Sequence, residues 1–195
     1  MFKGIKELFG NYFLLKEFAE TRRNISVANL ENAKTIGILF DSSDPEEFEL
    51  VKRYVLYLKD WKKKVKAIGF FSQKKIPNLT YSKLEYDFFT LKELNWYHKP
   101  SNIYIRNFIH EETDVLIDLN IHDRFPLKYI SAMSKAKFKI GKYSDADKFI
   151  YDMMIETDKK QGMKYFLRQV DTYLQMVNKN VDNSTNSVVG GISSR

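Results

Sequence analysis

The order of apolar and polar residues divides the chain into short apolar runs separated by longer amphipathic segments. The runs Thr35 to Phe40 and Val115 to Leu119 are apolar at nearly every position, which is typical of strands buried on both faces of a parallel sheet. The pattern predicts strands near residues 35–40, 65–71, 85–89, 115–119 and 137–141, and a candidate edge strand near residues 149–155.

Helix signals lie between several of these strands. Asp44 is a plausible N-cap, Pro45 suits a first helical turn, and Glu47 is placed to complete a capping box. Apolar residues at helical spacing predict helices at residues 1–23, 45–61, 126–136 and 158–178, the last capped by Asp158. Residues 102–112 are ambiguous between strand and helix, and residues 110–113 favour a short helix before the central strand.

The alternation of strands with helices is typical of a parallel sheet covered by helices on both faces. We therefore predict an α/β fold: a single three-layer Rossmann-like domain with a mainly parallel sheet over residues 35–178, ending in a C-terminal helix. Residues 1–34 should form an N-terminal amphipathic helix and a connector, and residues 179–195 a disordered tail. The expected core includes Ile36, Ile38, Val51, Val55, Ile68, Leu116, Ile117, Ile130 and Phe138.

The N-terminal segment contains enough charge to argue against several membrane roles. Its expected apolar face consists of Phe2, Ile5, Phe9, Tyr12 and Phe13. Acidic residues interrupt the apolar content, so it is no secretory signal, and they would be repelled by anionic lipid. We expect this helix to pack on its own domain or on a protein partner, and no membrane association.

Composition and missing motifs narrow the chemistry. The chain has no cysteine, which excludes disulfides, thiolate zinc sites and cysteine nucleophiles and suits a cytoplasmic protein. His110 begins a sequence similar to a zinc-binding HExxH, but Asp114 occupies the position of the second histidine, so no metal is expected. The turn after the first strand has Asp41 and Asp44 where a dinucleotide site needs glycines, and we expect no cofactor.

The charge of the chain favours a polyanionic partner. The formal net charge is +7, and lysines gather in two parts of the sequence. The candidate nucleic-acid-binding residues are Lys62, Lys63, Lys64, Lys74, Lys75, Lys137, Lys139 and Lys142. With no recognisable catalytic motif, these lysines favour a non-enzymatic protein that docks on RNA or on a ribonucleoprotein such as the ribosome.

The loop after the central strand supports an alternative hypothesis. His122, Asp123 and Arg124 follow a strand whose C-terminal end is where parallel sheets place their ligands. An enzyme acting on a phosphorylated or nucleotide ligand could use His122 as acid or base and Arg124 on phosphate. A structural interpretation is that Asp123 caps the next helix, Arg124 pairs with an acid and His122 is solvated. A protein adaptor is a further alternative.

The segment DVLIDLNIHDRFPLKYISAMSKAKFKIG, together with the basic amphipathic N-terminus, is similar to a small bacterial family of unknown function over most of the folded length. The resemblance implies a bacterial cytosolic protein and supplies no activity or functional residues. Between Asp114 and Gly141, the Ile-Asp-Leu strand end, polar loop, helix and Ala-Lys-Phe-Lys-Ile-Gly also resemble part of the heptosyltransferases. Those enzymes have two Rossmann-like domains, and this chain has room for about one.

Overall fold

The computed structural model of the chain describes residues 2–76, 85–157 and 161–177. Six strands form one sheet in the order β3-β2-β1-β4-β5-β6, and each neighbouring pair is parallel. The strands are β1 (Thr35–Asp41), β2 (Lys64–Phe71), β3 (Tyr86–Thr90), β4 (Val115–Asp118), β5 (Phe138–Lys142) and β6 (Met153–Ile155). This confirms the predicted Rossmann-like parallel sheet, with an edge strand shorter than expected.

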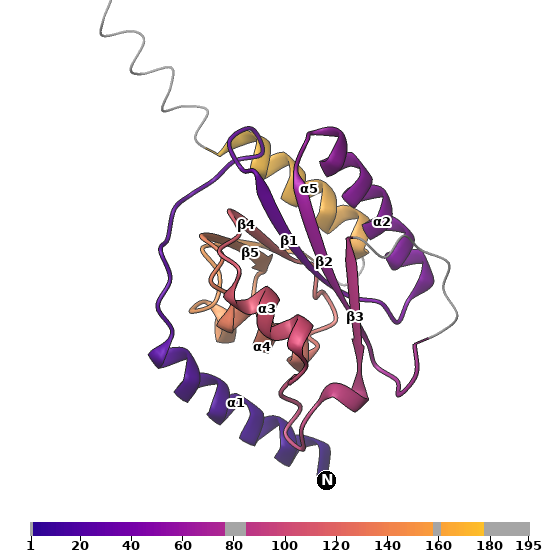
Figure 1. The fold of residues 1–195 in the computed structure, drawn as a ribbon, viewed down its shortest axis with the longest axis vertical. Helices are drawn as coiled ribbons and strands as arrows, with labels where there is room; N and C mark the ends of the chain where they lie inside the picture. The colour runs from indigo at the N-terminus through magenta and orange to yellow at the C-terminus, as the bar shows by residue number, and fades with distance from the viewer. Residues whose placement is uncertain (1, 77–84, 158–160, 178–195) are drawn as a thin grey trace, which may run out of the picture.

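Helices cover both faces of the sheet (Figure 1). The α-helices of the described residues are α1 (Phe2–Glu20), α2 (Pro45–Asp60), α3 (Ile103–His110), α4 (Phe125–Met133) and α5 (Gly162–Met176). α2 and α5 pack on one face, and α3 and α4 pack on the other (Figure 1). The short helix expected at residues 110–113 lies earlier, because Asn102 caps it through the N–H of Ile105. Asp158 and the tail at 179–195 fall outside the described residues.

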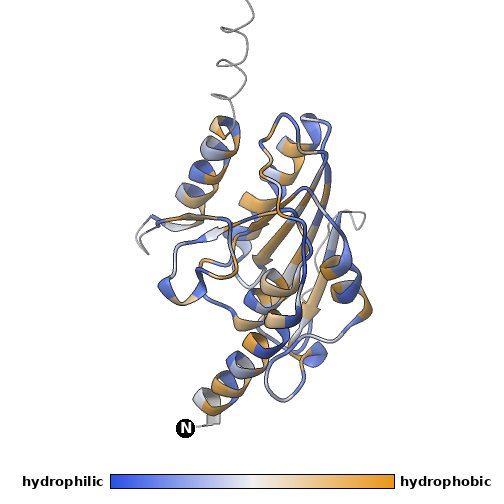
Figure 2. Cartoon of the chain, turned by 90° about the vertical axis from the view of Figure 1, so that its left-hand side faces the viewer, coloured by the Kyte–Doolittle hydropathy of each residue, from blue (hydrophilic) through white to orange (hydrophobic). Residues whose placement is uncertain are grey.

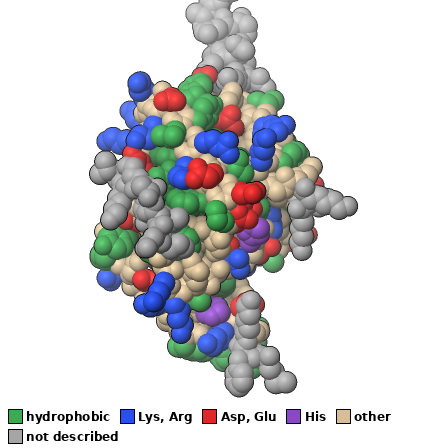
Figure 3. All heavy atoms as spheres, turned by 90° about the vertical axis from the view of Figure 1, so that its right-hand side faces the viewer, with side chains coloured by type: hydrophobic (Ala, Val, Ile, Leu, Met, Phe, Trp, Pro, Cys, Tyr) green, Lys and Arg blue, Asp and Glu red, His purple; other side chains and the backbone are tan. Residues whose placement is uncertain are grey.

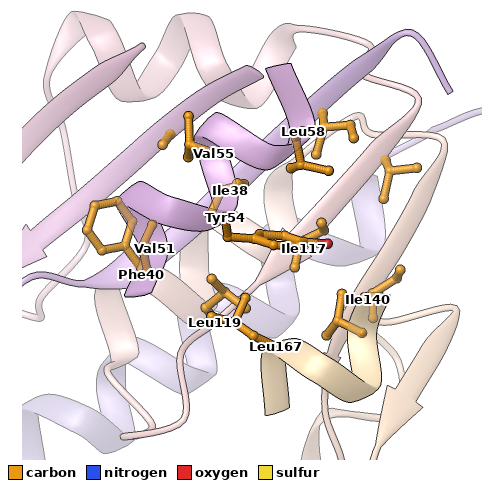
Figure 4. Packing of buried hydrophobic residues seen from close by; sticks show 14 of the residues in the cluster. Ile38, Phe40, Val51, Tyr54, Val55, Leu58, Ile117, Leu119, Ile140 and Leu167 are labelled. Carbon is orange, nitrogen blue, oxygen red and sulfur yellow. The ribbon is translucent and has the colours of Figure 1, made fainter. Parts of the chain in front are cut away.

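Neighbouring residues of a strand point to opposite faces, so each face has its own core. Ile38 and Phe40 of β1 pack against Val51 and Val55 of α2, as Figure 4 shows. Leu39 belongs to the cluster on the other face. Both faces are apolar because both are covered, and all nine predicted core residues are buried. Figure 2 shows the hydrophobic strands enclosed by helices whose outer sides are more hydrophilic.

The strand order creates a switch point at the centre of the sheet. From β1 the chain builds outward through β2 to β3, and then returns to the other side of β1 to build β4, β5 and β6. The loops after β1 and β4 therefore leave in different directions, and a crevice opens at the carboxyl ends of these two strands. Open α/β sheets bind their ligands at such a point.

α1 packs on its own domain, beside α4 and the loop that follows β3. Leu14 is 1% exposed, and the ring of Phe13 lies 4.8 Å from that of Tyr97. The packed side differs in part from the predicted one: Phe13 belongs to both, but Ile5 and Tyr12 are 49% and 62% exposed. Among the described residues, no helix is both long enough and apolar enough to cross a membrane.

Candidate functional site

The loop between β4 and α4 is held in shape by Asn120. Its side chain donates to the backbone carbonyl of Arg124 (3.0 Å) and accepts from the backbone N–H of Arg124 (2.7 Å). The backbone N–H of Asn120 donates to the side chain of Asp118 (2.9 Å). Asp123 adopts a φ of +54°, a left-handed conformation that aspartate tolerates better than most residues. The predicted capping of α4 by Asp123 is wrong: Arg124 is the N-cap residue, and Asp123 instead pairs with Lys142 (2.8 Å).

The side chain of His122 is 43% exposed, as expected of a solvated residue, but it also contacts a glutamate from the other side of the switch point. Its Nε2 lies 2.8 Å from Oε2 of Glu47, whose side chain is only 15% exposed. Asp44 does cap α2, but Glu47 is turned toward His122 and no capping box is formed there. A carboxylate that accepts the proton of Nε2 leaves Nδ1 as the acceptor of the neutral ring.

Arg124 joins the two halves of the site. Its Nε donates to Oδ2 of Asp41, the last residue of β1, which is 2% exposed. The expectation that Arg124 pairs with an acid is therefore confirmed. Its two terminal nitrogens make no hydrogen bond within the part of the chain that the structure describes. They are available to a ligand, and the guanidinium charge also compensates the buried carboxylate.

A hollow of about 600 Å³ lies beside these side chains. Its polar lining residues are Lys6, Glu7, Ser72, His98, His122, Asp123 and Arg124. Its apolar lining residues are Phe70, Leu91, Leu94, Phe125 and Pro126. His98 (φ +68°) and Asp123 are two of the three residues other than glycine with positive φ in the described chain, and both line this hollow. Unusual backbone conformations of this kind cluster at binding sites.

A second hollow of about 370 Å³ continues toward the end of β5, and shares Glu7, Asp123 and Phe125 with the first. Asp118 lies at its base, where it accepts hydrogen bonds from Tyr151 (2.6 Å) and from Ser131. Complete burial raises the pKa of Asp118, although these donors partly oppose the shift. Together the two hollows follow the carboxyl edge of the sheet on both sides of the switch point.

The predicted nucleic-acid-binding lysines do not form one surface. Lys62 and Lys64 are exposed at the start of β2, whereas Lys74 and Lys75 are exposed beyond its other end. Eight residues of strand separate these groups by about 23 Å. On the face drawn in Figure 3, basic side chains are interspersed with acidic ones.

Four other lysines of that set make contacts within the chain. Lys63 donates to the carbonyl of Ala33 (2.7 Å), Lys137 pairs with Asp114 (2.9 Å), and Lys142 pairs with Asp123. Lys139 is fully buried, so its prediction as a nucleic-acid contact must be corrected. The sheet is covered on both faces, and both sides of β5 are therefore interior.

Sequence reasoning missed several residues of the site. Asp41 ends β1, Glu47 follows it, and His98 follows β3, so the rule that ligands bind at carboxyl ends of strands could have drawn attention to them. Lys6 comes from α1 and carried no such signal. Within the described ranges, no three His, Cys, Asp or Glu side chains gather in a way that could hold a metal ion.

Comparison with known proteins assigns the chain to a family. It matches the model of a family of unknown function, DUF6913, over residues 6–177, and therefore belongs to that family. No curated protein and no solved structure matches the chain. The local resemblance to heptosyltransferases and the bacterial origin stay predictions.

Proposed function

We propose that this member of the DUF6913 family binds a phosphorylated small molecule of the nucleotide type at the switch point of its sheet. The observation that carries the proposal is the hollow of about 600 Å³, in which Arg124 and His122 lie beside an apolar surface. Its volume falls in the range of roughly 300 to 1,000 Å³ that is common for small-molecule sites.

The lining suits the two ends of such a ligand. The free terminal nitrogens of Arg124 provide a planar fork for phosphate oxygens, and Lys6 adds a second cation. Phe70, Leu91 and Leu94 offer apolar contact to a ring. The phosphate is not expected in the usual Rossmann position, because Asp44 already accepts from the first amides of α2.

His122 gives this site the means for acid–base chemistry. When Nε2–H donates a hydrogen bond to Glu47, Nδ1 can take a proton from a substrate hydroxyl or from water. The carboxylate of Glu47 then stabilises the resulting imidazolium. An enzyme acting on the phosphorylated ligand is therefore the finer form of the proposal. It assigns proton transfer to His122, phosphate binding to Arg124 and orientation of the imidazole to Glu47.

RNA docking is a second candidate function, with fewer residues to support it. Lys62 and Lys64 are exposed and have no ion pair among the described residues. They are near the exposed Lys34, because Lys64 donates its amide to the carbonyl of Lys34 (2.9 Å). The RNA site would thus lie at the amino edge of the sheet, opposite the hollow.

Ligand-induced thermal shifts with a panel of nucleotides and sugar phosphates test the main proposal. We expect at least one compound to stabilise the protein, and Arg124→Lys to weaken its binding about tenfold, because lysine lacks the fork while still compensating Asp41. His122→Asn should affect turnover more than affinity.

Arg106→Gln, an exposed change on α3, is the matched control and should bind as the wild type does. Absence of any shift, or full binding by Arg124→Lys, would refute the proposal.

A further inference from the structure

α1 has apolar residues on two opposite sides, and only one of them is covered. On the inner side, Leu14 is buried and Gly10 lies against Phe125. On the outer side, Leu8 and Leu15 are 71% and 53% exposed. A helix normally buries each of its apolar sides against another element. Figure 2 shows α1 at the edge of the molecule, with hydrophobic residues along its length.

The outer residues are spaced as in a coiled coil. Those of the outer seam are Ile5, Leu8, Tyr12, Leu15 and Ala19, which are separated by alternating steps of three and four. This is the a and d pattern of the heptad, and it keeps one face of a helix turned toward a partner helix. Single apolar residues are ordinary on protein surfaces, but a continuous seam over the whole helix is not. The exposed ring of Trp96, 5.4 Å from that of Phe9, widens the patch.

We propose that the outer seam pairs with α1 of a second copy of this chain, in an antiparallel dimer. A two-fold axis near the middle of the helix places Ile5 opposite Leu15 of the second copy, and Leu8 opposite Tyr12. Each a residue then meets a d residue, as knobs-into-holes packing requires. The same patch serves both partners, which is the arrangement of most homodimers.

The helix dipoles favour the antiparallel orientation, because it places the N-terminal end of each helix beside the C-terminal end of the other. Lys16 is the charged residue that flanks the outer seam on the side of Phe9, one heptad further along. Antiparallel pairing puts the two Lys16 ammonium groups at opposite ends of the interface and brings the two Phe9 rings together near its centre. Parallel pairing would place like ends of the two helix dipoles side by side. The dimer also has a consequence for the hollows, because it would fix the helix that contributes Lys6 and Glu7 to their lining.

The oligomeric state of the full chain tests the proposal. Sedimentation equilibrium over a series of concentrations should give a dimer that dissociates on dilution, and Leu8→Glu should make it monomeric. Leu8 is too exposed for this change to unfold the domain. Leu56→Glu is the matched control, since Leu56 is 60% exposed on α2 and its replacement should leave the dimer intact. A wild-type monomer at every concentration, or a dimer unaffected by Leu8→Glu, would overturn the proposal.

Orientation is tested by cross-linking, which the absence of native cysteine makes simple. In the antiparallel dimer, a chain with Leu8→Cys should form a disulfide with a chain that carries Tyr12→Cys, and Leu8→Cys alone should not. A disulfide between two Leu8→Cys chains would overturn the antiparallel arrangement. Binding of a monomer to vesicles of anionic phospholipid, lost in Leu8→Glu, would replace the second copy with a membrane surface.

Discussion

Lys139 shows how strongly a single buried residue can depend on its surroundings. Its ammonium group donates to the carbonyl of Ala132 (3.0 Å), near the C-terminal end of α4. Burial, and after it the charge of Arg23, lower the pKa of Lys139 from its usual 10.5 to about 7, while Asp152 acts in the opposite direction. The side chain is therefore partly neutral at physiological pH, in a position where charge is costly.

This depressed pKa makes stability depend on pH. Between the folded pKa of about 7 and the unfolded value of 10.5, the unfolded chain binds more protons at this lysine, so its contribution to stability rises with pH. We expect the free energy of unfolding to rise by about 2 kcal/mol from this group between pH 7 and pH 9. Lys139→Met should lose that rise in urea titrations, and exposed Lys62→Met should retain it. Equal pH dependence in all three proteins would contradict the expectation.

The sequence predicted core residues well and charged ones poorly, for one physical reason. Ile38 or Val55 is buried wherever its element is covered, so an apolar pattern is sufficient to identify it. Lys139 lies in a strand in which lysines occur between apolar residues, so the local pattern does not show that it is buried. Its burial depends on α4, which covers the face of the sheet to which Lys139 points. Glu47 fits the capping-box pattern, but the histidine that attracts it lies 75 residues away.

At the scale of elements, the docking of α1 depends on one close approach. A Cβ atom at Gly10 would lie 2.8 Å from the carbonyl oxygen of Tyr97 and 2.7 Å from the ring of Phe125. Gly4, in the same helix, has nothing within 4 Å of the equivalent position. The same substitution at the two glycines therefore measures helix propensity alone at Gly4, and helix propensity together with packing at Gly10.

We predict opposite effects for the same substitution at these two sites. Gly4→Ala should raise stability by up to about 1 kcal/mol, because alanine favours the helix. Gly10→Ala should lower it by about 1 to 3 kcal/mol, since the methyl group would collide with the ring of Phe125 and with the backbone carbonyl of Tyr97. Chemical denaturation of both variants provides the measurement. Stabilisation by both would mean that α1 does not pack tightly at Gly10.

The side of α1 that packs on the domain could not be predicted from the sequence of the helix itself. Helical spacing correctly indicated a helix at the N-terminus, but apolar residues surround its axis and no single face stands out. The packed side is selected by Tyr97 and Tyr129, which lie in a loop and in another helix far along the chain. Periodicity within one segment contains no information about them.

At the scale of the whole molecule, strand order decides which residues meet. Arg124 contacts Asp41 only because β4 returns to lie beside β1, although the two residues are 83 positions apart. The alternation of strands and helices predicts a parallel sheet but not its order. The loop with His122 and Arg124 could therefore be named from the sequence, and its partners could not.

Strand order also divides the positive charge, and this limits what nucleic acid can engage. Lys34, Lys62 and Lys64 are exposed at the amino edge of the sheet, and Lys74 and Lys75 are exposed beyond the carboxyl end of β2. A single strand docked at the amino edge would meet about three lysines. Each contact contributes about 0.7 to the slope of log affinity against log salt for single-stranded nucleic acid.

We therefore expect a shallow slope of about −2 for a single-stranded RNA, with little sequence preference, because lysine–phosphate contacts do not read bases. Fluorescence anisotropy over a series of salt concentrations would measure it. The double change Lys62→Glu and Lys64→Glu should weaken binding and flatten the slope without unfolding the domain, since both side chains are exposed. Lys74→Glu with Lys75→Glu is the matched control at the opposite end. A slope of about −3.5 or steeper, or equal loss in both double variants, would mean that RNA spans both edges of the sheet.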